Sequence, residues 1–117
     1  MKDFRALKIW ARSHQLTLEL YRASRTFPKD ETFGVTSQLR RAAASVPANI
    51  AEGCGRSGDA ELSRFLSISL GSACELDYFI LLATELGYLS KEEGSKYGRE
   101  ALELRRMLGT FIQKLKA

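Results

Sequence analysis

Proline, cysteine and histidine are all scarce in this chain, and each scarcity excludes a class of structure. Only two of the 117 residues are proline, which favours long helices, because a proline inside a helix removes a hydrogen bond and clashes with the preceding turn. The two cysteines, Cys54 and Cys74, are too few for a disulfide scaffold or a zinc site, and we expect both to be buried free thiols. The single histidine, His14, has no cysteine or second histidine at ligand spacing. We therefore expect no metal or cofactor, and a histidine within the core or at its edge.

A long hydrophobic run is also missing. The most apolar stretch, residues 65–83, is interrupted by Glu75 and Asp77, whereas a membrane span needs roughly 20 mainly apolar residues. The first residues, MKDFR, lack the apolar core of a signal peptide. We expect a single cytoplasmic domain over residues 1–117, with no membrane partner.

The sequence does contain one spacing rule, which recurs four times. Apolar or small residues step by three or four positions along four separate segments, as helices that each bury one face require. The stripes are Phe4, Leu7, Ala11, His14, Leu18 and Tyr21; Leu39, Ala43, Val46, Ile50 and Gly53; Leu62, Leu66, Ser69, Ala73, Leu76, Ile80 and Ala83; and Tyr97, Ala101, Leu104, Leu108, Phe111 and Leu115. This pattern, with short connections, predicts an all-α, antiparallel up-down-up-down four-helix bundle.

Capping residues and a proline indicate where the helices begin and bend. Thr36 can cap the second helix, and Pro47 should bend it near Ala43, whose carbonyl group loses its amide partner. Ser90 and Glu93 form a capping box for the fourth helix. The expected ranges are about 3–26, 36–53, 59–86 and 90 to nearly 117.

The first and third helices carry more apolar residues than one bundle requires. A helix of a monomeric bundle should have a polar outer face, and an exposed apolar face usually marks an interface. The residues that lie away from the predicted core stripes, and that we expect to form an oligomer interface, are Ile9, Leu16, Leu20, Phe27 and Gly71.

Basic residues are concentrated in the first half of the chain. The net charge is +4, and residues 1–58 hold ten Lys and Arg against five Asp and Glu. Rows of such residues can neutralise phosphates, although each row can equally be a solvated helix face. The candidate nucleic-acid-binding residues are Arg5, Lys8, Arg12, Arg40 and Arg41.

No catalytic residues are indicated. The serines lack a nucleophile setting such as Gly-x-Ser-x-Gly. The glycine-rich residues 53–58 follow no predicted strand and precede no Lys-Ser/Thr pair, so they are typical of a helix end and turn, not of a phosphate loop. We expect that the protein is not an enzyme.

Several stretches resemble one known family. They are FRALKIW at residues 4–10, QLRRAAASVPANIAEG at residues 38–53 and RFLSISLGSACEL at residues 64–76, together with Phe27-Pro28 and Gly55-Arg56. They look like the corresponding stretches of the four-helix-bundle proteins of the 23S rRNA intervening-sequence family, and the likeness covers essentially the whole chain.

That resemblance implies an antiparallel four-helix bundle that assembles as a homopentamer. Family members are often encoded within insertions in bacterial large-subunit ribosomal RNA genes. A similar pentameric bundle is the accessory protein of diversity-generating retroelements, where it binds nucleic acid and a reverse transcriptase. The resemblance therefore implies RNA or DNA, a reverse transcriptase or another protein as candidate partners, and it implies no enzyme activity.

Polar residues in the shared stretches form a candidate network where the second and third helices meet. They are Arg40 or Arg41, with Asn49, Glu52, Arg56, Arg64 and Glu75. Arginine–carboxylate pairs there could be bidentate, and the network could supply the donor that the carbonyl freed by Pro47 needs. The alternative is that these residues contact a ligand directly.

The sequence thus predicts a non-enzymatic, ring-like homo-oligomer of four-helix bundles that binds RNA or DNA by charge. The alternative is a protein-interaction scaffold that uses its second apolar face for a partner and binds no nucleic acid. Binding to nucleic acid should weaken steeply with salt, whereas binding through an apolar interface should not.

Overall fold

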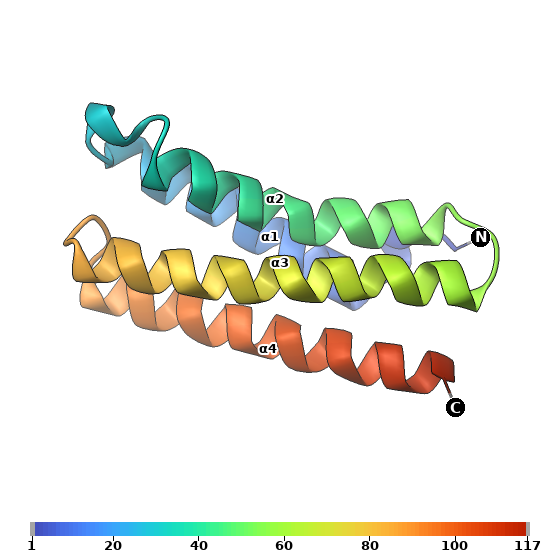
Figure 1. Cartoon of the computed structure of the whole chain (residues 1–117). Helices are drawn as coiled ribbons and strands as arrows, with labels where there is room; N and C mark the ends of the chain where they lie inside the picture. Colours follow the sequence, from blue (N-terminus) through green and yellow to red (C-terminus); the bar gives the residue numbers. More distant parts are fainter. Residues whose placement is uncertain (1, 117) are drawn as a thin grey trace.

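Four long antiparallel helices make up the computed structural model, which describes residues 2–116 (Figure 1). They are α1 (Lys8–Ala23), α2 (Val35–Cys54), α3 (Asp59–Glu85) and α4 (Lys91–Lys116), and single 3₁₀ turns flank α1 at η1 (Phe4–Ala6), η2 (Ser24–Thr26) and η3 (Lys29–Glu31). The predicted all-α four-helix bundle is confirmed.

The helices form a rod of 43 × 22 × 20 Å. Both α2 and α4 pack against α1 and against α3, so α1 and α3 occupy opposite corners of the bundle. In Figure 1, α3 lies in front and α1 behind, and the two chain ends lie at the same end of the rod. An even number of antiparallel helices joined by short connections produces this arrangement.

The helix ends follow local hydrogen bonding. The capping box of α4 is confirmed, because the amide of Glu93 donates to Ser90 Oγ and the amide of Ser90 donates to Glu93 Oε1, each over 3.0 Å. The expected cap at Thr36 is wrong: α2 begins one residue earlier, where the amide of Val35 donates to Glu31 Oε1 over 3.3 Å. Thr36 is buried inside the helix instead.

The first helix is shorter than expected, and it faces the opposite way. Extended backbone at Leu7 separates α1 from the turn before it. The predicted core stripe of this helix is mostly its outer surface, where His14 is exposed and Tyr21 is 41 % exposed. The expected interface residues are instead in the core, with exposures between 0 and 7 %, so they are not available to another subunit: they are Ile9, Leu16, Leu20 and Phe27.

Two small polar residues explain which face of α1 is buried. Ser13 and Thr17 are buried with the core residues of this face, and small side chains let α1 and α2 approach closely. Thr17 Oγ1 lies 3.0 Å from the carbonyl oxygen of Ala43, which is the acceptor that Pro47 leaves without an amide. The donor for the freed carbonyl therefore comes from α1 and not from the predicted arginine–carboxylate network.

Helix α3 is long and apolar enough to cross a membrane by length and composition alone, with a mean hydropathy of 1.5 over an 18-residue window. Glu75 and Asp77 do not lower that value enough to exclude it, contrary to our expectation. One third of this window is buried inside the bundle. Outside the core, α3 exposes large apolar side chains, among them Ile68, Tyr78 and Leu81.

Candidate functional site

Two of the five candidate nucleic-acid-binding residues are already paired with carboxylates. Arg12 on α1 donates to both carboxylate oxygens of Glu100 on α4, over 3.0 and 2.6 Å, and this hydrogen bonding raises the pKa of the Arg12 guanidinium group. Arg41 on α2 donates to Glu75 Oε2 on α3 over 2.7 Å. Both arginines connect helices and share their charge with a carboxylate.

Arg40, on α2, forms no ion pair with a carboxylate among the described residues; its side chain contacts the end of α1 instead. Its Nε donates to Ser24 Oγ over 2.8 Å and one terminal nitrogen donates to the Tyr21 carbonyl oxygen over 3.2 Å. Arg22 lies in the last turn of α1, and Arg25 lies three residues later in η2. Arg40 is thus held at a helix end that carries two further arginines in its sequence.

We call Arg22, Arg25, Lys29 and Arg40 the basic corner. None of the four forms an ion pair with a carboxylate among residues 2–116. Of this group, only Arg40 is among the predicted nucleic-acid-binding residues, although Arg22, Arg25 and Lys29 follow the row of Arg5, Lys8 and Arg12 in the sequence. Phe33, near Lys29 in the same connection, is 94 % exposed.

Arg5 and Lys8 lie near the first turns of α1, far from the basic corner. Arg5 sits over the ring of Phe4, with 4.4 Å from Cζ to the ring centroid, and Lys8 lines a groove beside α4. The predicted strip of Arg5, Lys8 and Arg12 is therefore not one row of available charges, because Glu100 neutralises its last member.

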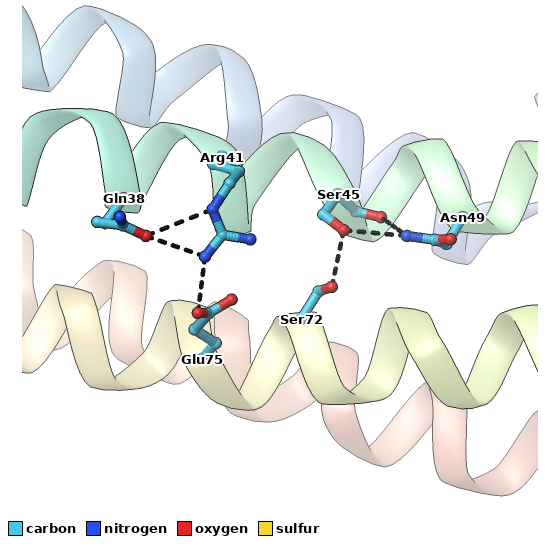
Figure 2. A network of polar contacts seen from close by, with 6 residues as sticks. All are labelled: Gln38, Arg41, Ser45, Asn49, Ser72 and Glu75. Carbon is cyan, nitrogen blue, oxygen red and sulfur yellow. Dashed lines mark hydrogen bonds and ion pairs between the residues drawn. The ribbon is translucent and has the colours of Figure 1, made fainter. Parts of the chain in front are cut away.

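The expected polar network between α2 and α3 is divided into separate groups. Figure 2 shows the central contacts, in which Asn49 Nδ2 donates to the carbonyl and Oγ of Ser45 over 2.8 and 2.9 Å. Ser45 Oγ lies 2.8 Å from Ser72 Oγ across the helix interface. Arg41, held by Gln38, contacts Glu75 about one helical turn away (Figure 2). Asn49 and Glu75 thus belong to neighbouring groups with no bond drawn between them.

The remaining members of that predicted network pair within their own helix or at its end. Arg56 contacts Glu52 over 3.1 Å, and Arg64 contacts Glu61 over 3.0 Å. The hydrogen bond from Arg64 lowers the pKa of the Glu61 carboxyl group. Both guanidinium groups also lie over the ring of Phe65. Partners three or four residues away satisfy these arginines, so the prediction of a single inter-helix network is wrong for Glu52, Arg56 and Arg64.

Two outward apolar surfaces remain on the bundle. The first, the α1–α2 hollow, has a volume of about 500 Å³ and is lined by Phe4, Trp10, His14, Thr17, Leu18, Tyr21, Ala44, Pro47, Ala48 and Ala51. The second, the α3 stripe, consists of Ile68, Gly71, Cys74, Tyr78 and Leu81, all exposed. Gly71 has open space beside it, so it stays a candidate for close approach by another helix. Cys74 is exposed and not buried as expected, whereas Cys54 is buried.

Metal-ligating side chains do not gather anywhere in the described part of the chain. Within residues 2–116, no group of three or more His, Cys, Asp or Glu side chains could hold a metal ion. His14 stacks on Trp10 at 4.8 Å between ring centroids, which accounts for its position on the outer face of α1.

Comparisons with known proteins agree with this architecture. A search of curated proteins finds no match. Among solved structures, the chain is similar to a protein of unknown function from the S23 ribosomal protein family of Bacteroides thetaiotaomicron VPI-5482. The TM-score is 0.79 at 21 % identity, and the match covers 89 % of this chain and 97 % of that one. The family described as 23S rRNA-intervening sequence protein matches residues 5–110, and the chain therefore belongs to that family.

Proposed function

We propose that the protein is a non-enzymatic, ring-forming homo-oligomer that binds RNA or DNA through the basic corner. The observation that carries this proposal is the docking of Arg40 on Ser24 and Tyr21 at the end of α1, in the segment of chain that also carries Arg22 and Arg25. Clustered cations without carboxylate partners can neutralise phosphates and release counterions. Binding of this kind positions nucleic acid without reading its sequence.

Phe33 adds a second element to the same end of the bundle. Its ring is almost fully exposed, and the amide of Thr32 donates to the Lys29 carbonyl oxygen over 3.1 Å, which folds the segment before Phe33 into a tight turn. An exposed aromatic ring beside cations can stack on an unpaired base. The basic corner with Phe33 therefore suits structured RNA that has unpaired bases, or single-stranded ends of DNA.

Assembly follows from the two outward apolar surfaces. The α1–α2 hollow and the α3 stripe are separate surfaces made by different helices, so one surface of each copy can contact the other surface of the next. When one surface of each copy contacts the other surface of the next, the interface is head-to-tail, and it closes into a ring where the rotation allows. A pentamer is the ring size that the family resemblance implies.

A ring would repeat the basic corner once per subunit. Several weak sites held at fixed separation bind a long polyanion far more tightly than one site does. This multivalency lets a chain with a net charge of only +4 bind nucleic acid.

Fluorescence anisotropy with a labelled RNA hairpin and a labelled DNA duplex tests the nucleic-acid part. Replacing Arg22, Arg25 and Arg40 together by Gln should weaken binding at low salt and reduce the slope of log affinity against log salt. The matched control replaces Arg56, Arg64 and Arg106, which lose the same charge but pair within three or four residues. Equal weakening by the two triple variants, or no binding by the wild type, would overturn the proposal.

Light scattering after size-exclusion chromatography tests assembly. The mass should be several times 13.1 kDa, and Leu18→Glu or Ile68→Glu should reduce it to that of one chain while leaving helical content intact. Leu102→Glu on α4 is the control, because Leu102 is exposed outside both surfaces. Leu16→Glu and Leu20→Glu should instead unfold the protein, since both side chains are in the core.

The second candidate function is a protein-interaction scaffold, for example an accessory subunit without nucleic-acid binding of its own. The exposed apolar surfaces on α1, α2 and α3 favour it. Under this candidate the wild-type oligomer retards neither RNA nor DNA at low salt, and a partner protein binds with little dependence on salt.

A further inference from the structure

A third surface lies between the N-terminal half of α1 and the C-terminal half of α4, and neither proposal above uses it. It is a groove of about 470 Å³. Its apolar lining is Leu7, Ile9, Met107 and Phe111, and its polar lining includes Lys8, Glu103, Arg106 and Lys114. The residues from Glu103 to Lys114 cover three turns of α4, or about 16 Å at 1.5 Å per residue.

Arg12 lies beside this groove, next to its lining residue Met107. Its guanidinium group bridges α1 to Glu100 on α4, and one of its nitrogens lies 3.5 Å from Met107 Sδ. A bidentate arginine–carboxylate pair has a fixed geometry. The pair therefore ties the two helices together next to the groove.

The rim of the groove is positively charged. Lys8 and Lys114 form no ion pair with any residue of the described range 2–116, and Arg106 Nη1 lies 3.8 Å from Glu103 Oε2. Carboxylates on a partner would find these two lysines beside an apolar floor, together with Arg106, whose charge is shared with Glu103. Met107 adds a flexible side chain of the kind that adapts to different apolar partners.

We propose that this groove binds an amphipathic helix of a partner protein, with the helix's apolar face on the floor and acidic residues beside that face paired with Lys8, Arg106 and Lys114. Helices recognise grooves through apolar residues at three- and four-residue spacing, and three turns of groove accept one such face. The apolar floor favours a protein over a nucleic acid, which would leave the floor uncovered. The α3 stripe of a second copy fits less well, because its nearby carboxylates Glu75 and Asp77 are already bound by Arg41 and Arg105.

The chain supplies a separate reporter for each face of α1. Met107 is one of only two methionines, and Trp10 is the only tryptophan. Methyl-¹³C-methionine NMR therefore follows the groove through Met107, and Met107→Leu assigns its signal. Trp10 fluorescence follows the α1–α2 hollow on the other side.

The experiment titrates the full-length protein with a synthetic helical peptide of about four turns that carries Leu at helical spacing and Glu on both sides of the Leu stripe. The Met107 methyl signal should shift in a saturable manner, while Trp10 fluorescence stays constant. A peptide with Lys in place of Glu, and a peptide with Ser in place of Leu, should each bind at least about tenfold more weakly.

Variants locate the binding. Lys8→Glu with Lys114→Glu should weaken peptide binding by about tenfold or more, whereas Lys91→Glu with Arg99→Glu, an equal charge change outside the groove, should not. The basic-corner triple variant should bind the peptide like the wild type, which separates this proposal from nucleic-acid binding. The proposal is overturned if the acidic peptide does not shift Met107, or if the rim and control variants weaken binding equally. It is also overturned if an RNA hairpin or protein concentration alone produces the Met107 shift, since nucleic acid or a second copy would then be the occupant.

Discussion

Thr17 Oγ1 lies 3.0 Å from the carbonyl oxygen of Ala43 and 2.8 Å from that of Ser13. A hydroxyl group has one proton to donate. In an α-helix the Ser13 carbonyl already receives the amide of residue 17, whereas the Ala43 carbonyl has no amide because residue 47 is proline. The Ala43 carbonyl therefore depends on Thr17 more than the Ser13 carbonyl does.

Replacing Thr17 by Val keeps the shape of the side chain and removes the donor. We expect a loss of about 1–3 kcal/mol in the free energy of unfolding, since a buried carbonyl group is left without a partner. In a Pro47→Ala background the new amide can bond Ala43, so Thr17→Val should cost less there. Urea unfolding of the four proteins gives this coupling directly. A cost that is the same in both backgrounds would show that Thr17 does not serve the carbonyl freed by Pro47.

The two inter-helix arginine–carboxylate pairs should differ in their contribution to stability. Arg12 and Glu100 are about 30 % exposed and make two hydrogen bonds, whereas Arg41 and Glu75 are 55 and 40 % exposed. Arg12→Gln should cost about 2 kcal/mol in the free energy of unfolding. Arg41→Gln and Glu52→Gln should each cost about 1 kcal/mol or less, since exposed pairs contribute little. Equal losses in chemical denaturation would contradict this ranking.

The two thiols should differ in reactivity, and the difference should report assembly. Cys54 is 2 % exposed and burial raises the pKa of its thiol, so it should react with a thiol reagent only on unfolding. Cys74, in the α3 stripe, should react rapidly in the assembly-breaking Ile68→Glu variant and slowly in the wild-type oligomer. Equal Cys74 rates in both proteins would show that the α3 stripe is not covered by a neighbouring subunit.

The hydrogen bond from Tyr88 to Glu31, 2.8 Å long, should make part of the stability depend on alkaline pH. The bond raises the pKa of Tyr88 in the folded protein. Its contribution is therefore complete below the usual tyrosine pKa of about 10 and is lost as pH rises through the higher folded value. The difference in urea midpoint between wild type and Tyr88→Phe should be largest near pH 8 and shrink above about pH 10. The control is Tyr78→Phe, which removes a hydroxyl with no hydrogen bond among the described residues.

The four helices were predictable because local rules set them. The capping box at Ser90 and Glu93 and the apolar periodicity of three helices act within a few residues along the chain. The inward face of α1 was not predictable from periodicity, because both of its faces are apolar at helical spacing. The choice depends on Thr17 meeting Ala43, and that contact joins two helices.

In the candidate site, too, contacts between residues close in sequence were predictable and contacts between distant residues were not. The pairs Glu52–Arg56 and Glu61–Arg64 follow from spacings of four and three residues, which are visible in the sequence. The pairing of Arg12 with Glu100 spans 88 positions, so no local pattern indicates it. For that reason a row of cations that looks continuous in the sequence loses its last member to a carboxylate on α4.

The two apolar faces of α1 also bear on how the sequence can change over evolutionary time. An ordinary bundle helix has one face on which substitutions are nearly neutral, but α1 has its core on one side and the α1–α2 hollow on the other. Neutral drift should therefore be scarce along α1 and concentrated on the outward positions of α4, such as Arg99 and Gln113, which are exposed and polar. Divergence between relatives should accumulate on the last helix much faster than on the first.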